Sequence, residues 1–232
     1  MSETISKVPT HLGLILDGNR RWATDRNLPT LDGHKKGYEN LKTIAKYGFD
    51  KGVKFISAYV FSTENWKRSV EEVDYLMKLL IWVATNEVKE LDKQNIRVCF
   101  MGEDERLEAK VIKAMRDAEE LTKDNTGGTL LLCMNYGGQL EIASAVNAIL
   151  AENPAVTRVT PADIEAHLYH PEVPPVDLII RTSGEQRISN FMLWRMSYSE
   201  LYFAPMHWPA FTEQDLQAAL DEYASRHRRI GK

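Results

Sequence analysis

An acid, a glycine and two arginines follow a short apolar run near the start of the chain. Residues 14–16 are Leu-Ile-Leu, typical of a buried strand, and Asp17, Gly18, Arg20 and Arg21 come directly after them. Glycine lets main-chain N–H groups approach a ligand closely, and arginine supplies fixed positive charge. A carboxylate beside them suits Mg²⁺ bound to phosphate oxygens. The stretch therefore favours a phosphate and metal site, although Asp-Gly-Asn alone is more typical of a strand-to-helix turn.

Two later stretches repeat this pattern of an apolar run that breaks abruptly into polar residues. Residues 55–61 lead into the polar run 62–68, and residues 177–180 lead into 181–190, which contains Arg181 and Arg187. The rigid fork of arginine donors matches phosphate oxygens. Two arginine-rich loops are therefore enough to bind two phosphorylated groups, or one diphosphate each.

Strand-like and helix-like segments alternate along the chain and would position these loops. Strands are expected at residues 14–16, 55–61, 97–101, 129–135, 177–180 and 201–203. This alternation predicts a single α/β domain over residues 1–232, with a mostly parallel central sheet of about six strands and helices on both faces. Parallel strands end at one edge of the sheet, so the polar loops should meet there.

A long helix with a broad apolar stripe is expected between the second and third strands. Ser69 and Glu72 have capping-box spacing, and apolar residues recur at helical intervals through Leu91. Such a helix is either buried against the sheet and a neighbour or forms the wall of an apolar tunnel. The pattern alone favours simple burial.

Composition narrows the class of protein. With 44% hydrophobic residues and a net charge of −4, the chain is typical of a globular protein and unlike a general nucleic-acid binder. Cys99 and Cys133 lie in apolar runs and are expected to be reduced core residues in a cytoplasmic protein. Residues 1–10 form a polar N-terminal segment, and the sequence has no membrane-span run, so any membrane contact would be peripheral.

Several common catalytic motifs are missing from the sequence. It has no Gly-x-x-x-x-Gly-Lys-Ser/Thr loop, no Gly-x-Gly-x-x-Gly turn and no nucleophile elbow, which weakens kinase, ATPase and dinucleotide interpretations. His167 and His170 are three residues apart, but without acidic or thiolate partners in view a surface role is favoured over metal binding.

The ordered motifs resemble those of the cis-prenyltransferase family over nearly the whole chain. The matching segments are residues 17–23, Gly33-His34, residues 61–66 with Arg68, residues 135–138, residues 181–185, residues 187–191 and residues 200–203. The Asp-Asp-x-x-Asp motif of trans-prenyltransferases does not occur. The resemblance implies sequential condensation of isopentenyl diphosphate onto an allylic diphosphate primer such as farnesyl diphosphate. It also implies Mg²⁺ as cofactor, a homodimer, and undecaprenyl diphosphate for a cell-wall lipid carrier as product.

The resemblance also implies roles for individual residues. Asp17 and Asn65 would be catalytic, and Asp17 and Glu200 would hold Mg²⁺. Substrate contacts are implied for Gly18, Asn19, Arg20, Arg21, Trp22, Thr30, His34, Ser62, Thr63, Glu64, Trp66, Arg68, Arg181, Arg187, Ile188 and Ser189. Because a neutral amide is a poor base, we expect Asn65 to orient groups while diphosphate or water accepts the proton. Trp22, Trp66 and Phe61 are expected either to line the prenyl chain or to pack in the core.

Two positions depart from the family pattern, and three functions stay open. Thr30 stands where many relatives have arginine, and Gln186, a weak Mg²⁺ ligand, replaces a histidine. Residues 229–231 match a family tail implied to reach a partner subunit. The alternatives to long-chain elongation are a short-chain synthase, a non-catalytic partner subunit of the same fold, and an unrelated Mg²⁺-dependent phosphate-ester hydrolase. The bulk of Val60 and Tyr38 favours a shorter product.

Overall fold

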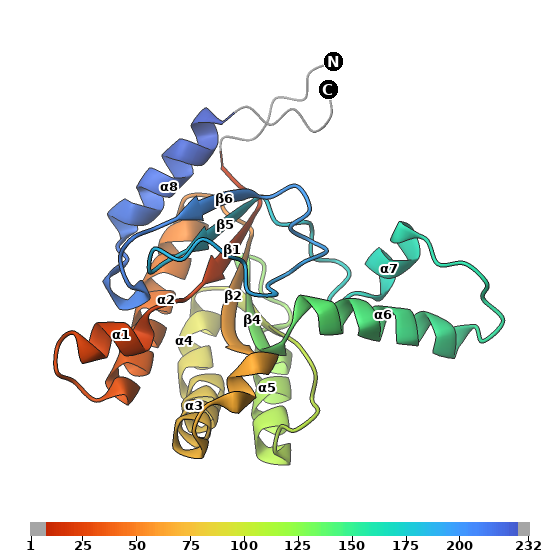
Figure 1. Cartoon of the computed structure of the whole chain (residues 1–232), viewed down its shortest axis with the longest axis horizontal. Helices are drawn as coiled ribbons and strands as arrows, with labels where there is room; N and C mark the ends of the chain where they lie inside the picture. Colours follow the sequence, from red (N-terminus) through yellow and green to blue (C-terminus); the bar gives the residue numbers. More distant parts are fainter. Residues whose placement is uncertain (1–7, 227–232) are drawn as a thin grey trace.

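The computed structural model describes residues 8–226, which form alternating strands and helices (Figure 1). In chain order the elements are β1 (His11–Ile15), α1 (Asn19–Thr24), α2 (Thr30–Asp50), β2 (Phe55–Ser62), the 3₁₀ turn η1 (Thr63–Lys67), α3 (Val70–Trp82), the π-helical segment η2 (Val83–Glu87), α4 (Val88–Lys93), β3 (Ile96–Met101), α5 (Ala109–Thr122), β4 (Gly128–Tyr136), α6 (Gly138–Glu152), α7 (Pro161–His167), β5 (Leu178–Arg181), β6 (Glu200–Phe203), η3 (Trp208–Ala210) and α8 (Glu213–Ser225).

The predicted six-stranded sheet is confirmed. Its strand order is β3-β4-β2-β1-β5-β6, and each neighbouring pair is parallel. Because β1 lies between β2 and β5, the loops that follow these three strands meet at the middle of one sheet edge. This is where ligands bind in open α/β sheets.

The two faces of the sheet are covered differently. Alternate strand residues such as Leu12 and Leu14 join one large core with α2, α3, α4, α5 and α8. The opposite face packs mainly against an irregular segment, through residues such as Val173, Val176 and Phe191. Helices α6 and α7 extend to one side and share a small core of their own (Figure 1). The expectation of helices on both faces therefore understated how much irregular chain covers the second face.

The helix predicted to run unbroken to Leu91 is interrupted. It forms α3, then the π-helical turn η2, then α4. Within this turn the Thr85 hydroxyl donates to the Ile81 carbonyl at 2.7 Å, and the Asn86 amide donates to the Trp82 carbonyl at 3.1 Å. These side chains satisfy carbonyls that a widened turn would otherwise leave unpaired, which explains why the break is tolerated here.

Other expectations about the core are confirmed, and some lie outside the described chain. Cys99 and Cys133 are buried and unpaired with each other. Among residues 8–226, the helices are too short or too polar for any of them to span a bilayer. Helix α8 ends at Ser225, and the tail at residues 229–231, predicted to reach a partner, lies outside the described residues.

Candidate active site

The turn after β1 has a conformation that only glycine adopts easily. Gly18 has φ of 102°, and a Cβ there would lie 2.4 Å from Ser183 Oγ and 2.6 Å from His207 Nδ1. The Asp17 carbonyl accepts hydrogen bonds from the Trp208 N–H at 2.9 Å and from the Thr182 hydroxyl at 2.7 Å. Hydrogen bonds from the segments that follow β5 and β6 therefore hold this turn in place.

Asp17 joins the first arginine loop (residues 17–22) to the second (residues 181–190). Its Oδ2 accepts from Arg181 Nη2 at 2.7 Å and its Oδ1 from Arg21 Nη2 at 3.0 Å. Burial alone would raise the pKa of Asp17, but the hydrogen bond and charge of Arg181, with the charge of Arg21, lower this pKa below its ordinary value. Asp17 is therefore an anion at neutral pH and is suited to holding cations rather than transferring protons.

Around the first arginine loop, three basic side chains converge on one buried carboxylate. Glu72 accepts hydrogen bonds from Arg68 at 3.0 Å and His34 at 3.1 Å, and it forms an ion pair with Arg20 at 3.3 Å. Its backbone N–H is capped by Ser69, as predicted, but its side chain does not close the capping box. The buried Glu72 carboxylate is thus surrounded by hydrogen-bond donors and positive charge, which offsets the cost of burying its own charge.

A depression beside this carboxylate collects most of the residues predicted to bind the first diphosphate. Those that line it are Asp17, Gly18, Asn19, Arg20, Arg21, Thr30, His34 and Arg68. Burial lowers the pKa of His34, and Arg68 and Arg20 lower it further, against the opposite effect of Glu72. At neutral pH the depression therefore keeps its net positive charge on the arginines.

In the second arginine loop, Arg181 is buried and held by several hydrogen bonds. Arg181 is only 4% exposed, and its Nη1 donates to Ser189 Oγ at 2.8 Å and to the Arg187 carbonyl at 2.5 Å. Glu185 pairs with Arg187 and, at 3.1 Å, with Arg21, which links the two loops a second time. Ser189 has φ of 48° and lies next to Ile188, whose carbonyl accepts from the Phe191 N–H.

The turn η1, which follows β2, connects the second arginine loop to the apolar interior. Asn65 Oδ1 accepts from the Ser62 N–H at 3.1 Å, completing a capping box. Glu64 accepts from the Asn190 amide at 3.3 Å. Asn65 Oδ1 accepts this hydrogen bond within the turn, and its NH₂ group can donate to a substrate, which agrees with an orienting role.

Thr63 and Trp66 lie at the same turn and hold it against β4. A Cβ on Gly137 would lie 3.0 Å from Thr63 Oγ1, so that turn and the end of β4 are in close contact. Trp66 donates its indole N–H to Asn135 Oδ1 at 2.7 Å and packs edge-on against Phe61.

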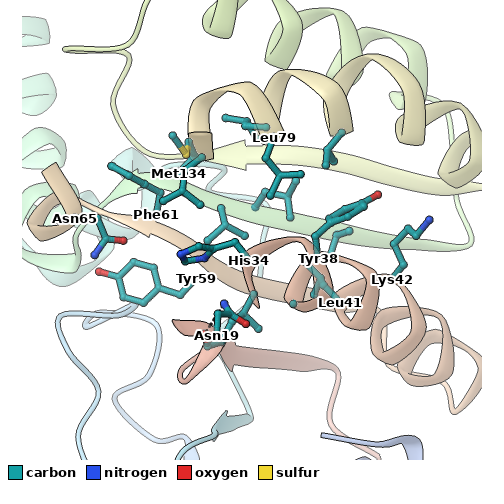
Figure 2. Close-up of a pocket in the computed structure, with 18 of the residues that line it drawn as sticks. Asn19, His34, Tyr38, Leu41, Lys42, Tyr59, Phe61, Asn65, Leu79 and Met134 are labelled. Atoms are coloured by element: carbon teal, nitrogen blue, oxygen red, sulfur yellow. Dashed lines mark hydrogen bonds between the residues drawn. The ribbon is translucent and has the colours of Figure 1, made fainter. Parts of the chain in front are cut away.

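An apolar cavity of about 160 Å³ opens next to the arginine loops. Asn19, His34 and Asn65 line one end of it, and Tyr38 and Lys42 line the other (Figure 2). Arg68 also lines it, and apolar residues of β2, β4, α2 and α3 form most of the wall. Val60, Tyr38 and the stripe of α3 are among them, so that stripe is a cavity wall as well as part of the core.

Of the three aromatic residues expected beside a prenyl chain, only Phe61 lines this cavity within the described part of the chain. Trp66 lies behind Phe61, as its contacts with Asn135 and Phe61 require. Trp22 instead stacks with the Arg26 guanidinium, 4.5 Å from the ring centroid. Both tryptophans therefore support the site by packing rather than by forming the cavity wall.

Glu200 does not meet Asp17 within one chain. Glu200 pairs in register with Leu178 at the amino end of β5, whereas Ile15, beside Asp17, pairs with Arg181 at the carboxyl end. The Glu200 carboxylate is bound instead by Arg226 at 2.8 Å. Within residues 8–226 no three His, Cys, Asp or Glu side chains are placed to hold a metal ion together. Of the two residues predicted to hold Mg²⁺, Asp17 lies beside the arginine loops and Glu200 does not.

Three residues of the site were missed as site residues from the sequence. Glu72 was interpreted only as a cap, and Glu185 was noted only as part of a motif. His207 gave no signal, yet its ring contacts Ser183 Oγ at 2.5 Å and Asp25 Oδ2 at 3.2 Å. An acid one turn into a helix that follows a polar run ending in Lys67-Arg68 is the pattern that could have revealed Glu72.

The fold and the site together define an α/β protein with two arginine loops beside an apolar cavity. Residues 15–231 match the family model described as putative undecaprenyl diphosphate synthase, and the chain belongs to this family of cis-prenyltransferases. It is accordingly a prenyltransferase enzyme of the cis-prenyl diphosphate synthase class.

Individual relatives agree with this assignment. The chain is 44% identical to an isoprenyl transferase of Thermotoga maritima, with 97% of each sequence covered. It is 46% identical to a trans,polycis-polyprenyl diphosphate synthase of Thermobifida fusca described as (2Z,6E)-farnesyl diphosphate specific, covering 97% of this chain and 81% of that one. The crystal structure of lavandulyl diphosphate synthase from Lavandula x intermedia with dimethylallyl diphosphate superposes with a TM-score of 0.91 at 35% identity, covering 97% and 99%.

Proposed function

We propose that this protein elongates prenyl chains in the cis configuration, by Mg²⁺-dependent condensation of isopentenyl diphosphate with an allylic diphosphate. The observation that carries the proposal is the meeting of two arginine loops at Asp17, in the depression that adjoins the mouth of an apolar cavity. A simple phosphate-ester hydrolase would need neither a second arginine loop nor the cavity. A non-catalytic subunit would have no reason to retain both Asp17 and Asn65 at that mouth.

Each arginine loop would bind one substrate. The allylic diphosphate would bind in the depression lined by Gly18, Asn19, Arg20, Arg21 and His34, with its tail in the adjoining cavity. Isopentenyl diphosphate would bind to Arg181, Arg187 and Ser189. In this arrangement both diphosphates lie near Asp17, because Arg21 and Arg181 contact its two carboxylate oxygens.

Asp17 is the residue that would hold Mg²⁺. A single carboxylate fits this ion because Mg²⁺ commonly takes one or two carboxylates, substrate phosphates and several waters. When bound, Mg²⁺ would offset the charge on the departing diphosphate. The low pKa of Asp17 keeps the carboxylate charged for this purpose.

In the reaction, the double bond of isopentenyl diphosphate would attack C1 of the allylic substrate as the bond from C1 to the diphosphate oxygen breaks. A proton then leaves the isopentenyl unit, and the new double bond is cis. Asn65 lies at the cavity mouth and would orient these groups, with a diphosphate oxygen or water as the proton acceptor. The arginines of the first loop would stabilise the charge on the leaving diphosphate.

Two product classes fit this chemistry. The first is undecaprenyl diphosphate made on a farnesyl primer for a cell-wall lipid carrier, as the family resemblance implies. The second is a short-chain cis-prenyl diphosphate, and a specific observation favours it: the cavity holds only about 160 Å³. That is close to the roughly 150 Å³ of an apolar cavity that accommodates benzene. Mass spectrometry of the product decides between them.

The direct test is incorporation of labelled isopentenyl diphosphate by the purified chain on dimethylallyl, geranyl or farnesyl diphosphate. We expect a longer apolar diphosphate with Mg²⁺ and none with a chelator. Absence of incorporation on every primer would refute the proposal, and release of phosphate from simple esters would point to the hydrolase. Turnover by this chain alone excludes the partner-subunit alternative.

We further propose that the enzyme is a cytoplasmic homodimer that meets the membrane only peripherally, where its lipid product would partition. Light scattering of the purified protein tests the dimer, and vesicle flotation tests the membrane contact.

A further inference from the structure

Two polar side chains, those of Tyr38 and Lys42, line the apolar cavity at the end away from the arginine loops. Along α2, His34 lies at the mouth, whereas Tyr38 and Lys42 follow one and two turns later, about 6 and 12 Å further along the helix axis. Figure 2 shows Asn65 at one end of the cavity and Tyr38 with Lys42 at the other. A tail that enters at the arginine loops and lies along α2 would therefore reach these two side chains.

Tyr38 and Lys42 share one partner, Glu87. The Tyr38 hydroxyl donates to Glu87 Oε2 at 3.2 Å, and Lys42 Nζ forms an ion pair with the same oxygen. Burial, reinforced by the charge of Glu87, raises the pKa of Tyr38, so its hydroxyl stays protonated and donates at physiological pH. Lys42 Nζ also lies 5.5 Å from the centroid of the Tyr38 ring.

The π-helical segment η2 positions the Glu87 side chain against Tyr38 and Lys42. A π turn contains an extra residue, which rotates the following residues by about 100° around the axis relative to an unbroken α-helix. Trp82, just before this segment, packs edge-on against Tyr38 with centroids 6.1 Å apart. Glu87 itself is the last residue of η2 and is 20% exposed, so it lies between the cavity and solvent.

We propose that Tyr38, Lys42 and Glu87 form a polar gate that closes the far end of the cavity and sets the length of the prenyl tail. This inference rests on the proposed function. A tail longer than the cavity must push the Tyr38 ring aside and break its hydrogen bond to Glu87. It must also place methyl groups against the Lys42 and Glu87 charges, which desolvates them. Elongation therefore stops when the tail meets the gate.

The product distribution of gate variants tests this directly. Tyr38→Ala should lengthen the main product by at least one isoprene unit, because it opens the wall and frees the Glu87 carboxylate. Tyr38→Phe, which keeps the ring, and Glu87→Gln, which breaks the ion pair, should shift the distribution the same way but less. An unchanged distribution in a folded, active Tyr38→Ala would overturn the gate. If Tyr38→Ala does not fold, an unchanged distribution in both milder variants overturns it.

Tyr47 provides a matched control on the same helix. Its hydroxyl donates to Gln217 at 2.9 Å, and Lys51 lies 4.9 Å from its ring centroid, so it has the same kinds of contacts but does not line the cavity. Tyr47→Phe and Tyr47→Ala should leave product length unchanged. An equal lengthening by the Tyr47 and Tyr38 variants would mean that product length follows general loosening of α2, against the proposal.

A binding experiment separates failure of the gate from failure of the proposed function. Unreactive alkyl diphosphates of increasing length are titrated into the wild type and Tyr38→Ala by calorimetry, so no turnover is needed. Each buried methylene strengthens binding about fourfold. Affinity should stop rising at a shorter chain in the wild type than in Tyr38→Ala, with a gap of at least tenfold beyond that length. Identical length dependence would overturn the gate even if the enzyme elongates prenyl chains.

Discussion

The two ends of the strands carry charge in different arrangements. At the amino ends, Glu200 is matched by Arg226, and the buried His11 contacts Ser57 Oγ and the Pro174 carbonyl, each at 2.8 Å. At the carboxyl ends, basic side chains outnumber the acids that they contact. The arginines there are Arg20, Arg21, Arg68, Arg181 and Arg187, and the acids are Asp17, Glu72 and Glu185.

This contrast distinguishes a charge that holds the fold together from one that binds a ligand. A matched, partly exposed pair contributes little, up to about 1 kcal/mol. An excess of arginines brought to one edge is unfavourable to the folded chain by itself, and an anionic substrate relieves it. Variants at the carboxyl ends should therefore change activity, whereas variants at the amino ends should change stability.

The largest effect is expected for Asp17→Ala. It removes the carboxylate that faces both arginine loops, and we expect turnover to fall about 10²- to 10³-fold, as when a preorganised electrostatic group is lost. The fold should persist because Arg181 keeps its contacts with Ser189 and the Arg187 carbonyl. Activity assays with circular dichroism and thermal unfolding check this. A variant that fails to fold would instead make Asp17 a structural residue.

At the opposite ends of the strands, His11 should make stability depend on pH. Burial lowers the pKa of His11 from 6.5 to about 4, so the unfolded chain binds this proton first as the pH falls. The contribution of neutral His11 is complete above pH 6.5 and is lost progressively between pH 6.5 and 4. At 1.36 kcal/mol per pH unit, the loss is about 3 kcal/mol.

Denaturant unfolding of the wild type and His11→Asn is measured across this pH range. Because the carboxylates titrate in both proteins, the difference between the two unfolding free energies reports the contribution of His11. The difference in unfolding free energy between the two proteins should shrink as the pH falls. A constant difference from pH 6.5 to 4 would contradict the prediction. Activity per folded molecule at pH 7.5 serves as the control and should be similar in both proteins.

Glu72→Gln tests the role of one carboxylate at the carboxyl ends of the strands. The neutral amide keeps the shape but no longer neutralises Arg20 and Arg68, so these arginines should lose their fixed positions. We expect KM for the allylic diphosphate to rise about tenfold, corresponding to about 1.4 kcal/mol. The neighbouring exposed Glu71→Gln is the matched control and should leave KM unchanged. Equal KM values in both variants would show that the Glu72 carboxylate does not contribute to binding the allylic diphosphate.

The smallest effect is expected for Glu200→Gln at the amino ends. Loss of the Arg226 pair, whose side chains are each 28% exposed, should lower the unfolding free energy by at most about 1 kcal/mol. The same variant tests the sequence-based prediction that Glu200 binds Mg²⁺. A higher Mg²⁺ concentration for half-maximal activity would support that prediction. An unchanged requirement would leave Glu200 with its structural pair alone.

Local chemistry in the sequence was enough to predict the strands and the site edge. Apolar runs that break into Gly18 and arginines appear directly in the sequence, and parallel strands bring their carboxyl ends together by topology. The order of the motifs also indicated the family. The sequence therefore predicted that Asp17, Arg20, Arg21, His34 and Arg68 lie beside one another.

Side-chain partners across long sequence distances were decided only by the tertiary structure. Glu72 appeared to be a helix cap, and its turn toward His34 and Arg68 depends on how α2 and α3 pack. The π turn that places Glu87 against Tyr38 was hidden because its residues continue a helical apolar pattern. The separation of Glu200 from Asp17 follows from strand register, which a motif does not record.

The sequence by itself determined which chemistry this protein carries, since residue types and turn positions follow from local order. The tertiary structure decided which acid each arginine meets and where the apolar cavity ends. The physical reason is the distance along the sequence over which each kind of interaction acts. Periodicity and turn preferences act over a few residues, whereas the contacts of Glu72, Glu87 and Arg181 join residues 38 to 164 positions apart.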